Sequence, residues 1–270
     1  MVVQHNLAAA NTNRQLGIIT NEQSKSTEKL SSGYRINRAG DDAAGLSISE
    51  KMRSQIRGLD KASSNAQDGI SLIQTAEGAL NETHSILQRM NELATQAAND
   101  TNTSVDRRAI QKEVNALASE ISRISSTTQF NTMNLLDGKF TGKNLQIGAL
   151  ANQSIAIKID AMDANTLGVN ALKVSDFTKA GAAMTSVQAA IDKVSTQRSS
   201  LGAIQNRLEH TIKNLDTTSE NTSSAESRIR DTDMAKEMVT YSKNNILMQA
   251  GQSMLAQANQ QNQGVLSLIQ

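Results

Sequence analysis

The sequence predicts a mainly α protein, a long antiparallel helical coiled-coil bundle with one small β-hairpin. Apolar residues recur at helical spacing over several long stretches, so each stretch has one apolar stripe to bury. Proline is absent, which removes every proline-driven break from these helices. Aromatic residues make up only 2% of the chain, so the core must be built from Leu, Ile, Val, Met and Ala. Such side chains suit narrow seams between helices.

The first half of the chain predicts long helices. Residues 5–33 form the first, and the glycines of SSGYRINRAGDD end it. Asp41 and Asp42 stand just before a much longer helix over residues 43–100, where a carboxylate can cap the helix and favour its positive end.

A capping-box spacing and a strand pattern follow. Thr103 and Asp106 begin another helix, whose apolar seam covers residues 110–124. Residues 140–160 predict a β-hairpin, because isoleucines alternate with other residues after the plausible turn GALAN.

Helical spacing returns near residue 178. Seven of nine seam positions between 187 and 215 are apolar, which favours a coiled coil. The polar stretch DTTSENTSSAE separates this helix from a last amphipathic helix over residues 232–268. Each end of the chain is too weakly apolar to fold alone, so we expect both ends to bury themselves against neighbours. This pattern favours assembly over catalysis.

Composition excludes several classes of partner. The 27 basic and 26 acidic residues give a formal net charge of +1, so we expect no nucleic-acid partner. No window approaches 18 apolar residues, and we expect no membrane insertion. Cysteine is absent, which excludes a disulfide framework and a thiolate zinc site. The N-terminus lacks the pattern of an ordinary signal peptide, so a chain that leaves the cell would need a dedicated export route.

Catalytic motifs are missing. His5, His84 and His210 lie in separate segments without a second ligand at metal spacing, and HExxH is absent. GKFTGK at residues 138–143 is one residue short of a phosphate-binding loop and precedes a strand instead of following one. We therefore expect no metal, no cofactor and no enzymatic activity.

Two further segments invite a functional interpretation. RINRAGDD places Arg35, Arg38, Asp41 and Asp42 in one loop, either as a charged contact between neighbouring subunits or as a capped, solvated linker. MQAGQSMLAQANQQNQ has helical spacing despite its polar composition, which favours a helix that orders on association over disorder.

Four segments resemble the bacterial flagellin family. LSSGYRINRAGDDAAGLSISEKMRSQIRGL is similar to the family's N-terminal signature almost word for word. RSSLGAIQNRLEHTIKNL, ENTSSAESRIRDTDMAKEMV and ILMQAGQSMLAQANQ resemble its C-terminal signature. The resemblance implies a structural subunit that assembles helically into the tubular flagellar filament, the propeller of bacterial motility.

The family's architecture implies four parts. They are an N-terminal inner-tube helix and linker (1–42), outer-tube long helices with the β-hairpin (43–177), the C-terminal long helix of the outer tube with its linker (178–231), and a C-terminal inner-tube helix (232–270). The two terminal helices would pair as an inner coiled coil. Only about 17 residues, 161–177, stand where larger relatives insert outer domains, so the chain resembles a minimal flagellin.

The resemblance also implies partners, a location and sites. The partners are other copies of the chain in a helical homopolymer, a flagellar export chaperone, the filament cap, hook-junction proteins and a host Toll-like receptor. The location is the extracellular filament, reached by type III export without a cleaved signal peptide. The receptor would bind Arg89, Leu93 and Glu113. The candidate subunit contacts are Arg35, Arg38, Asp41, Asp42, Met248, Leu255, Leu266 and Leu268.

Two alternatives stay open. A hook–filament junction protein shares the helical ends, but the C-terminal signature and the short middle argue against it. A cytosolic coiled-coil signalling module is disfavoured by the strand pair at 140–160 and the apolar tail VLSLI.

Overall fold

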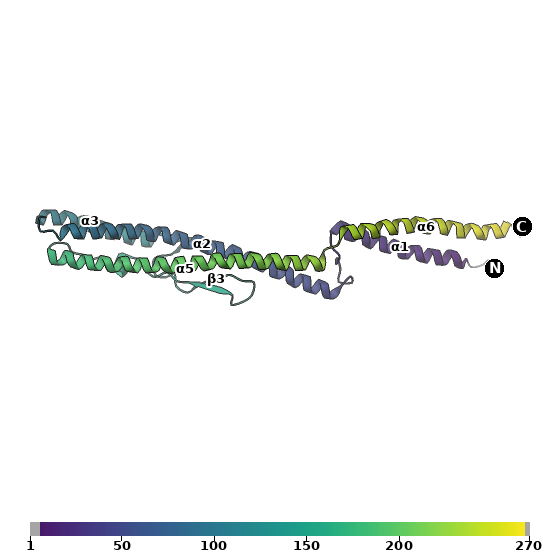
Figure 1. Ribbon diagram of the computed structural model, residues 1–270, viewed down its shortest axis with the longest axis horizontal. Coiled ribbons are helices and arrows are strands. Elements are labelled where there is room, and N and C mark those ends of the chain that lie inside the picture. Colours follow the sequence, from purple (N-terminus) through teal and green to yellow (C-terminus); the bar gives the residue numbers. More distant parts are fainter. Residues whose placement is uncertain (1–5, 268–270) are drawn as a thin grey trace. The chain divides into compact units, whose positions relative to one another are not determined.

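The computed structural model describes the backbone of residues 6–267 and the side chains of residues 6–260 (Figure 1). Its helices are α1 (Leu7–Ser32), α2 (Ala43–Ala97), α3 (Ser104–Thr127), α4 (Ala164–Leu167), α5 (Phe177–Arg230) and α6 (Met234–Ser267). Its strands are β1 (Gln129–Phe130), β2 (Met133–Asn134), β3 (Lys143–Gln146) and β4 (Ser154–Ile157). The mainly α class with a small hairpin is confirmed.

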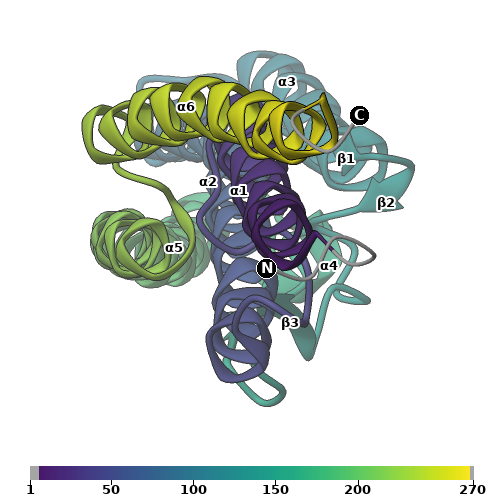
Figure 2. The ribbon, with the colours of Figure 1, turned by 90° about the vertical axis from the view of Figure 1, so that its right-hand side faces the viewer.

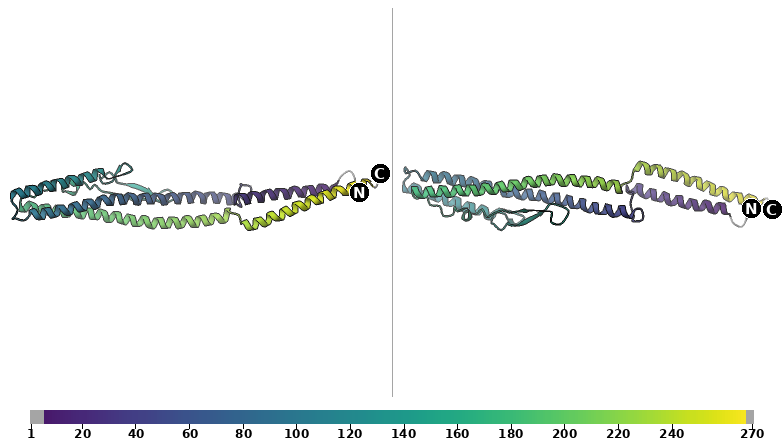
Figure 3. Two further views of the ribbon diagram at one scale, coloured as in Figure 1. Left: turned by 90° about the horizontal axis from the view of Figure 1, so that it is seen from above. Right: turned by 60° about the horizontal axis from the view of Figure 1, so that its bottom comes forward.

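The chain divides into two compact units. The first comprises Met1–Ser54 with Glu220–Gln270, and the second comprises Gln55–Ser219. In the first unit α1 and α6 lie side by side and run in opposite directions, as both views of Figure 3 show. Figure 2 looks at the end of this pair where α1 begins and α6 finishes. The chain's two terminal helices therefore do pair.

The second unit is built on helical seams. Its buried side chains recur at 3-4 spacing along α2, α3 and α5 and form a large apolar cluster, with a smaller one of Leu59, Ala62 and Leu215. Leu80, Leu87 and Met90 of α2, Ile121 of α3 and Leu201 of α5 are all fully buried in it. The apolar stripes of these helices are thus covered within the unit, while Val105 and Phe177, near the first residues of α3 and α5, stay exposed.

The β-hairpin packs on α2 inside the second unit. β3 and β4 pair antiparallel, and Ile155 and Ile157 point into the core while their neighbours are exposed. A Cβ added at Gly58 of α2 would lie 2.8 Å from Ala149 Cβ and 3.2 Å from its Cα. The hairpin turn therefore approaches the helix closely only because Gly58 has no side chain.

The structure corrects one predicted helix boundary. The polar stretch DTTSENTSSAE does not end the preceding helix, because α5 continues through it to Arg230. The Thr217 and Thr218 hydroxyls donate to carbonyls one turn earlier, and no glycine or proline interrupts residues 203–250. The serines and threonines form a solvated helix surface and not a linker.

Two small elements escaped the sequence analysis. β1 and β2 form a tight hairpin whose two-residue turn places Asn131 and Thr132 at positive φ, without the glycine that usually signals such a turn. α4 is a single turn capped by Asp163 and ended by Gly168, which adopts a left-handed conformation.

Candidate functional site

The histidines and acidic residues of the described chain do not gather at a metal site. Among residues 6–260 no group of three His, Asp or Glu side chains is placed to hold a metal. His84 on α2 contacts Gln88 at 3.0 Å, and His210 lies elsewhere, on α5. His5 lies outside the described residues. Within the described residues, no helix carries a stretch apolar enough to cross a bilayer.

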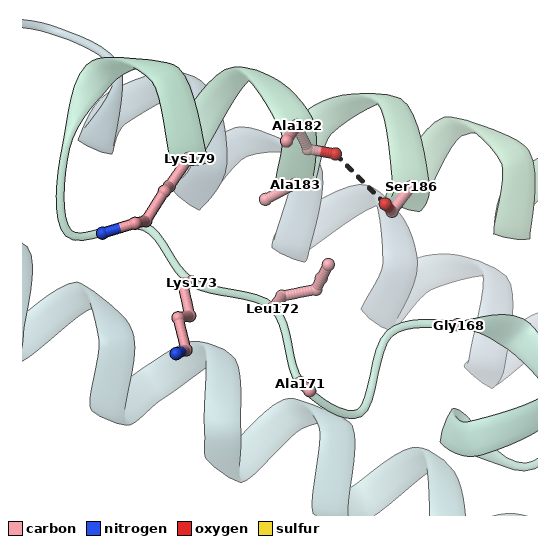
Figure 4. Close-up of a pocket in the computed structure, with 8 residues that line it drawn as sticks. All are labelled: Gly168, Ala171, Leu172, Lys173, Lys179, Ala182, Ala183 and Ser186. Atoms are coloured by element: carbon pink, nitrogen blue, oxygen red, sulfur yellow. Dashed lines mark hydrogen bonds between the residues drawn. The ribbon is translucent and has the colours of Figure 1, made fainter.

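A hollow in front of α5 is lined by two lysines and a serine among small and apolar residues (Figure 4). It has a volume of about 400 Å³ and is lined by the segment before α5 and by the first turns of that helix. The amino groups of Lys173 and Lys179 point away from Leu172 at its centre. The Ser186 hydroxyl donates to the Ala182 carbonyl at 3.1 Å, so it is occupied within its own helix.

The α1–α6 pair contains the most distinctive surfaces. Two contacts set its antiparallel register: Asn6 Nδ2 donates to the Ala258 carbonyl at 3.0 Å, and Leu16 Cδ1 lies 3.3 Å from a Cβ built on Gly251. The covered positions follow 3-4 spacing on both helices. On α1 they are Ala9, Thr12, Leu16, Ile19, Gln23, Ser26 and Leu30. On α6 they are Glu237, Tyr241, Asn244, Met248, Gly251, Leu255 and Ala258.

The seam of α6 is polar or small at several positions, while large apolar side chains face outward. Val239 and Ile246 are 71% and 66% exposed. Each follows a seam residue by two positions, which places it about 200° around the helix from the seam. Other exposed apolar side chains of the pair are Leu7, Ile18, Met234, Met238, Leu247 and Met254. An apolar surface left exposed along a helix in this way is a candidate interaction site.

The loop after α1 is fastened to the end of α5. Tyr34 and Asp231 form an antiparallel bridge, and the Arg35 backbone N–H donates to the Arg230 carbonyl at 2.6 Å. The Arg35 guanidinium also donates to the Ile229 carbonyl. The Arg230 guanidinium pairs with Glu50 at 2.9 Å and lies 4.7 Å from the centre of the Tyr34 ring.

The other charged residues of this loop also have partners within the chain. Arg38 forms a two-point ion pair with Glu28 of α1 at 3.0 and 3.1 Å. Asp41 accepts the Arg38 and Asn37 backbone N–H groups, which lower the pKa of its carboxyl. Asp42 accepts the Gly45 N–H at 2.8 Å and so caps α2. Each of these charged side chains therefore has a partner within its own chain.

Arg89 and Glu113 bring α2 and α3 together on the surface. The Nε and Nη2 atoms of Arg89 donate to Glu113 Oε1 at 3.1 and 3.0 Å, and Nη1 donates to Glu92 at 3.0 Å. The hydrogen bonds to Glu92 and Glu113 raise the pKa of Arg89. Leu93 does not share this surface. It is 2% exposed and belongs to the core beneath.

The remaining predicted contact residues fall in other places. Met248 and Leu255 lie in the α1–α6 seam, half covered by α1. Leu266 and Leu268 lie outside the residues whose side chains are described. The sequence analysis missed Val239, Ile246 and the other outward residues of α6. Helical periodicity shows an apolar stripe, but it does not say which side of the helix the partner covers.

Comparisons with known proteins agree with this geometry. The model of the bacterial flagellin N-terminal helical region matches residues 3–141, and that of the C-terminal helical region matches residues 184–269. A flagellin of Halalkalibacterium halodurans is 57% identical over 271 aligned residues, which cover all of both chains. A flagellin of Bacillus subtilis is 53% identical, again over all of both chains. The flagellar filament 31.3 kDa core protein of Treponema maltophilum is 50% identical over both full lengths.

Solved structures show the same fold. A Bacillus cereus flagellin crystal structure, 34% identical, gives a TM-score of 0.50 and covers 56% of this chain and 88% of that one. A putative flagellar hook-associated protein of Vibrio parahaemolyticus, at 13% identity, gives a TM-score of 0.60 and covers 71% of this chain and all of that one. At that identity the likeness concerns the fold alone.

Helical seams, outward apolar faces and the family matches define a helical structural protein built for self-assembly. The chain belongs to the bacterial flagellin family. It is a structural subunit of the flagellar filament and assembles with copies of itself.

Proposed function

We propose that the outward faces of α1 and α6 are the surfaces through which copies of the chain join in the filament. The carrying observation is the contrast within α6, whose covered seam contains Glu237, Asn244 and Gly251 while Val239 and Ile246 face away from it. Burying such exposed side chains stabilises by about 1.5–3 kcal/mol each. Repeated along two helices, this contribution can offset the entropy lost when a subunit is ordered in the polymer.

The proposal assigns each part of the chain a place in the polymer. Residues 1–42 and 232–270 form the inner tube, and residues 43–177 and 178–231 form the outer tube with its linkers. Met248, Leu255 and the two C-terminal leucines take part in ordering the inner tube. The loop residues Arg35, Arg38, Asp41 and Asp42 first fasten the chain to itself, and their exposed edges contact neighbouring copies.

The experiment compares three variants of purified full-length protein in growth from filament seeds, followed by electron microscopy. Val239→Asp with Ile246→Asp places two charges on the outward face and should abolish elongation. Gln252→Glu with Asn259→Asp adds the same charge at exposed polar positions away from that face of the same helix and should leave elongation near the parent rate. Loss of residues 235–270 should also stop elongation. Parent-like growth of the first variant overturns the proposal.

The biological setting of this polymer forms a second part of the proposal. The subunit acts without catalysis or a cofactor, and it leaves the cell through the flagellar export apparatus. An export chaperone, the filament cap and hook-junction proteins bind it on the way. The exposed apolar residues of α6 support this order of events, because such a surface needs a cover before assembly.

The free subunit is in addition a ligand for a host Toll-like receptor. The supporting feature is the joined Arg89–Glu113 surface, since a rigid arginine held by two carboxylates is a suitable interface anchor. Leu93 lies in the core and would contribute through the packing beneath this surface.

A further inference from the structure

The middle of the α1–α6 seam contains a layer of two carboxamides. One heptad beyond the Leu16–Gly251 contact, the antiparallel register places Gln23 of α1 opposite Asn244 of α6. Asn244 is 1% exposed and is a buried polar residue within a largely half-exposed helix pair. The side-chain oxygens of both Gln23 and Asn244 are out of contact with solvent and have no hydrogen-bond partner.

Two unpaired oxygens at one level of a seam are costly unless they find a donor. A carboxamide carries both an acceptor oxygen and an N–H₂ donor on the same planar group. A half turn of either group about its last bond exchanges the positions of its oxygen and its N–H₂, so one group can present a donor where the other presents an acceptor. The layer can therefore satisfy itself, and it needs no third group.

We propose that Gln23 and Asn244 form an amide hydrogen bond across the seam and thereby fix the register in which α1 pairs with α6. Sliding α6 by one heptad in either direction would place Asn244 opposite Leu30 or opposite Leu16. Either leucine would leave the amide buried without a partner. The polar layer thus penalises both neighbouring registers.

The neighbouring Ile19–Met248 layer does not choose between registers so strongly. Ile19 faces Met248 in the native register and would face Leu255 or Tyr241 after a slip of one heptad. Each of these pairs is apolar, and apolar side chains of similar size exchange at little cost. At a constant heptad repeat, a specific polar contact holds one alignment against its neighbours. A fixed alignment in turn keeps Val239 and Ile246 at constant positions along the α1–α6 pair, which their proposed contacts with neighbouring copies require.

The register can be measured by disulfide cross-linking, because the natural chain has no cysteine. Three full-length double variants share Ile19→Cys. Met248→Cys reports the native register, and Leu255→Cys and Tyr241→Cys report the two slipped ones. Each is assembled into filaments with an excess of the same chain without cysteines, so that bonds form within one subunit, and is then oxidised and mapped by peptide mass spectrometry.

In the parent background we expect the disulfide yield of the Ile19→Cys/Met248→Cys variant, which reports the native register, to exceed the yield of either slipped variant by about a factor of ten or more. The factor follows from the cost of burying an amide without a hydrogen-bond partner. In the Gln23→Leu/Asn244→Leu background the preference should fall severalfold and the slipped bonds should appear. The exchange variant Gln23→Asn/Asn244→Gln keeps two carboxamides and should keep the parent preference. Thr12→Leu, an apolar substitution in another layer, is the matched control and should also keep it.

Two results would overturn the proposal. One is an unchanged preference for the native-register bond in the double-leucine variant. The other is slippage in the exchange variant, which would mean that packing at these positions, and not the amide pair, sets the alignment. Both concern the pairing within one subunit, so they are distinct from failure of the outward face to drive elongation.

Discussion

Three glycines of α2 provide a graded test of how the β-hairpin packs on that helix. Replacing a glycine by alanine inside a helix stabilises by about 0.5–1 kcal/mol when the new methyl group meets nothing. Gly78 has no atom within 4 Å of a built Cβ, so Gly78→Ala should gain this full amount. At Gly58 the methyl group would meet the Cβ and the backbone Cα of Ala149 at 2.8 and 3.2 Å.

Backbone cannot move aside as a side-chain end can. Overpacking of this kind costs about 1–3 kcal/mol, which exceeds the helical gain, so Gly58→Ala should lose about 1 kcal/mol net. Gly69→Ala should fall between the two, because its methyl group would meet the end of the flexible Leu145 side chain. The expected order of unfolding free energy is Gly78→Ala, then parent, then Gly58→Ala, with a total spread of about 2 kcal/mol.

Guanidinium unfolding followed by circular dichroism measures this series, with melting temperature as a second readout. A difference of 1 kcal/mol corresponds to roughly 2–4 °C in a unit of this size. If Gly58→Ala is as stabilising as Gly78→Ala, the hairpin turn does not contact α2 in the way described.

Core packing, receptor binding and acid sensitivity give three more predictions. Leu87→Ala removes a fully buried side chain and should cost about 2–5 kcal/mol in chemical denaturation, whereas Leu150→Ala, at a position 68% exposed, should change stability by less than about 0.5 kcal/mol. Equal effects would contradict the assigned core. Arg89→Asp should weaken binding of the free subunit to the Toll-like receptor ectodomain by about 1–3 kcal/mol in titration calorimetry. Arg123→Asp disrupts a similar exposed ion pair and should leave the affinity unchanged. Unchanged affinity for Arg89→Asp would rule out this surface. The hydroxyl and backbone N–H of Thr103, the N-cap of α3, lower the pKa of Asp106. The stability that Asp106 contributes is therefore present above the unfolded pKa of 3.8 and is lost as the pH falls through the folded pKa. Asp106→Asn should therefore reduce the acid dependence of the unfolding free energy, and an identical pH profile for variant and parent would exclude this cap as a source.

The seams of the second unit could be predicted from the sequence because apolar spacing and burial coincide there. Ile110, Val114 and Ile121 lie on the predicted stripe of α3, and all three are buried. The Thr103–Asp106 capping box is present with both of its hydrogen bonds. The local apolar pattern and the tertiary packing agree at these positions, so the sequence spacing predicts which side chains are buried.

The α1–α6 pair could not be predicted in the same way. On α6 the apolar stripe expected from spacing included Met234 and Met238, but both are exposed. The covered seam passes through Asn244 and Gly251, which no hydrophobicity pattern would select. A helix with apolar residues on several sides does not reveal which side its own chain covers and which side is left for another copy.

A density map of the filament grown from the purified chain tests the central claim most directly, because it shows which side chains of α6 face neighbouring subunits. The account predicts that Val239 and Ile246 pack against other copies while Asn244 faces Gln23 of its own chain. A map in which Val239 and Ile246 line open solvent, and subunits join through other surfaces, would contradict it.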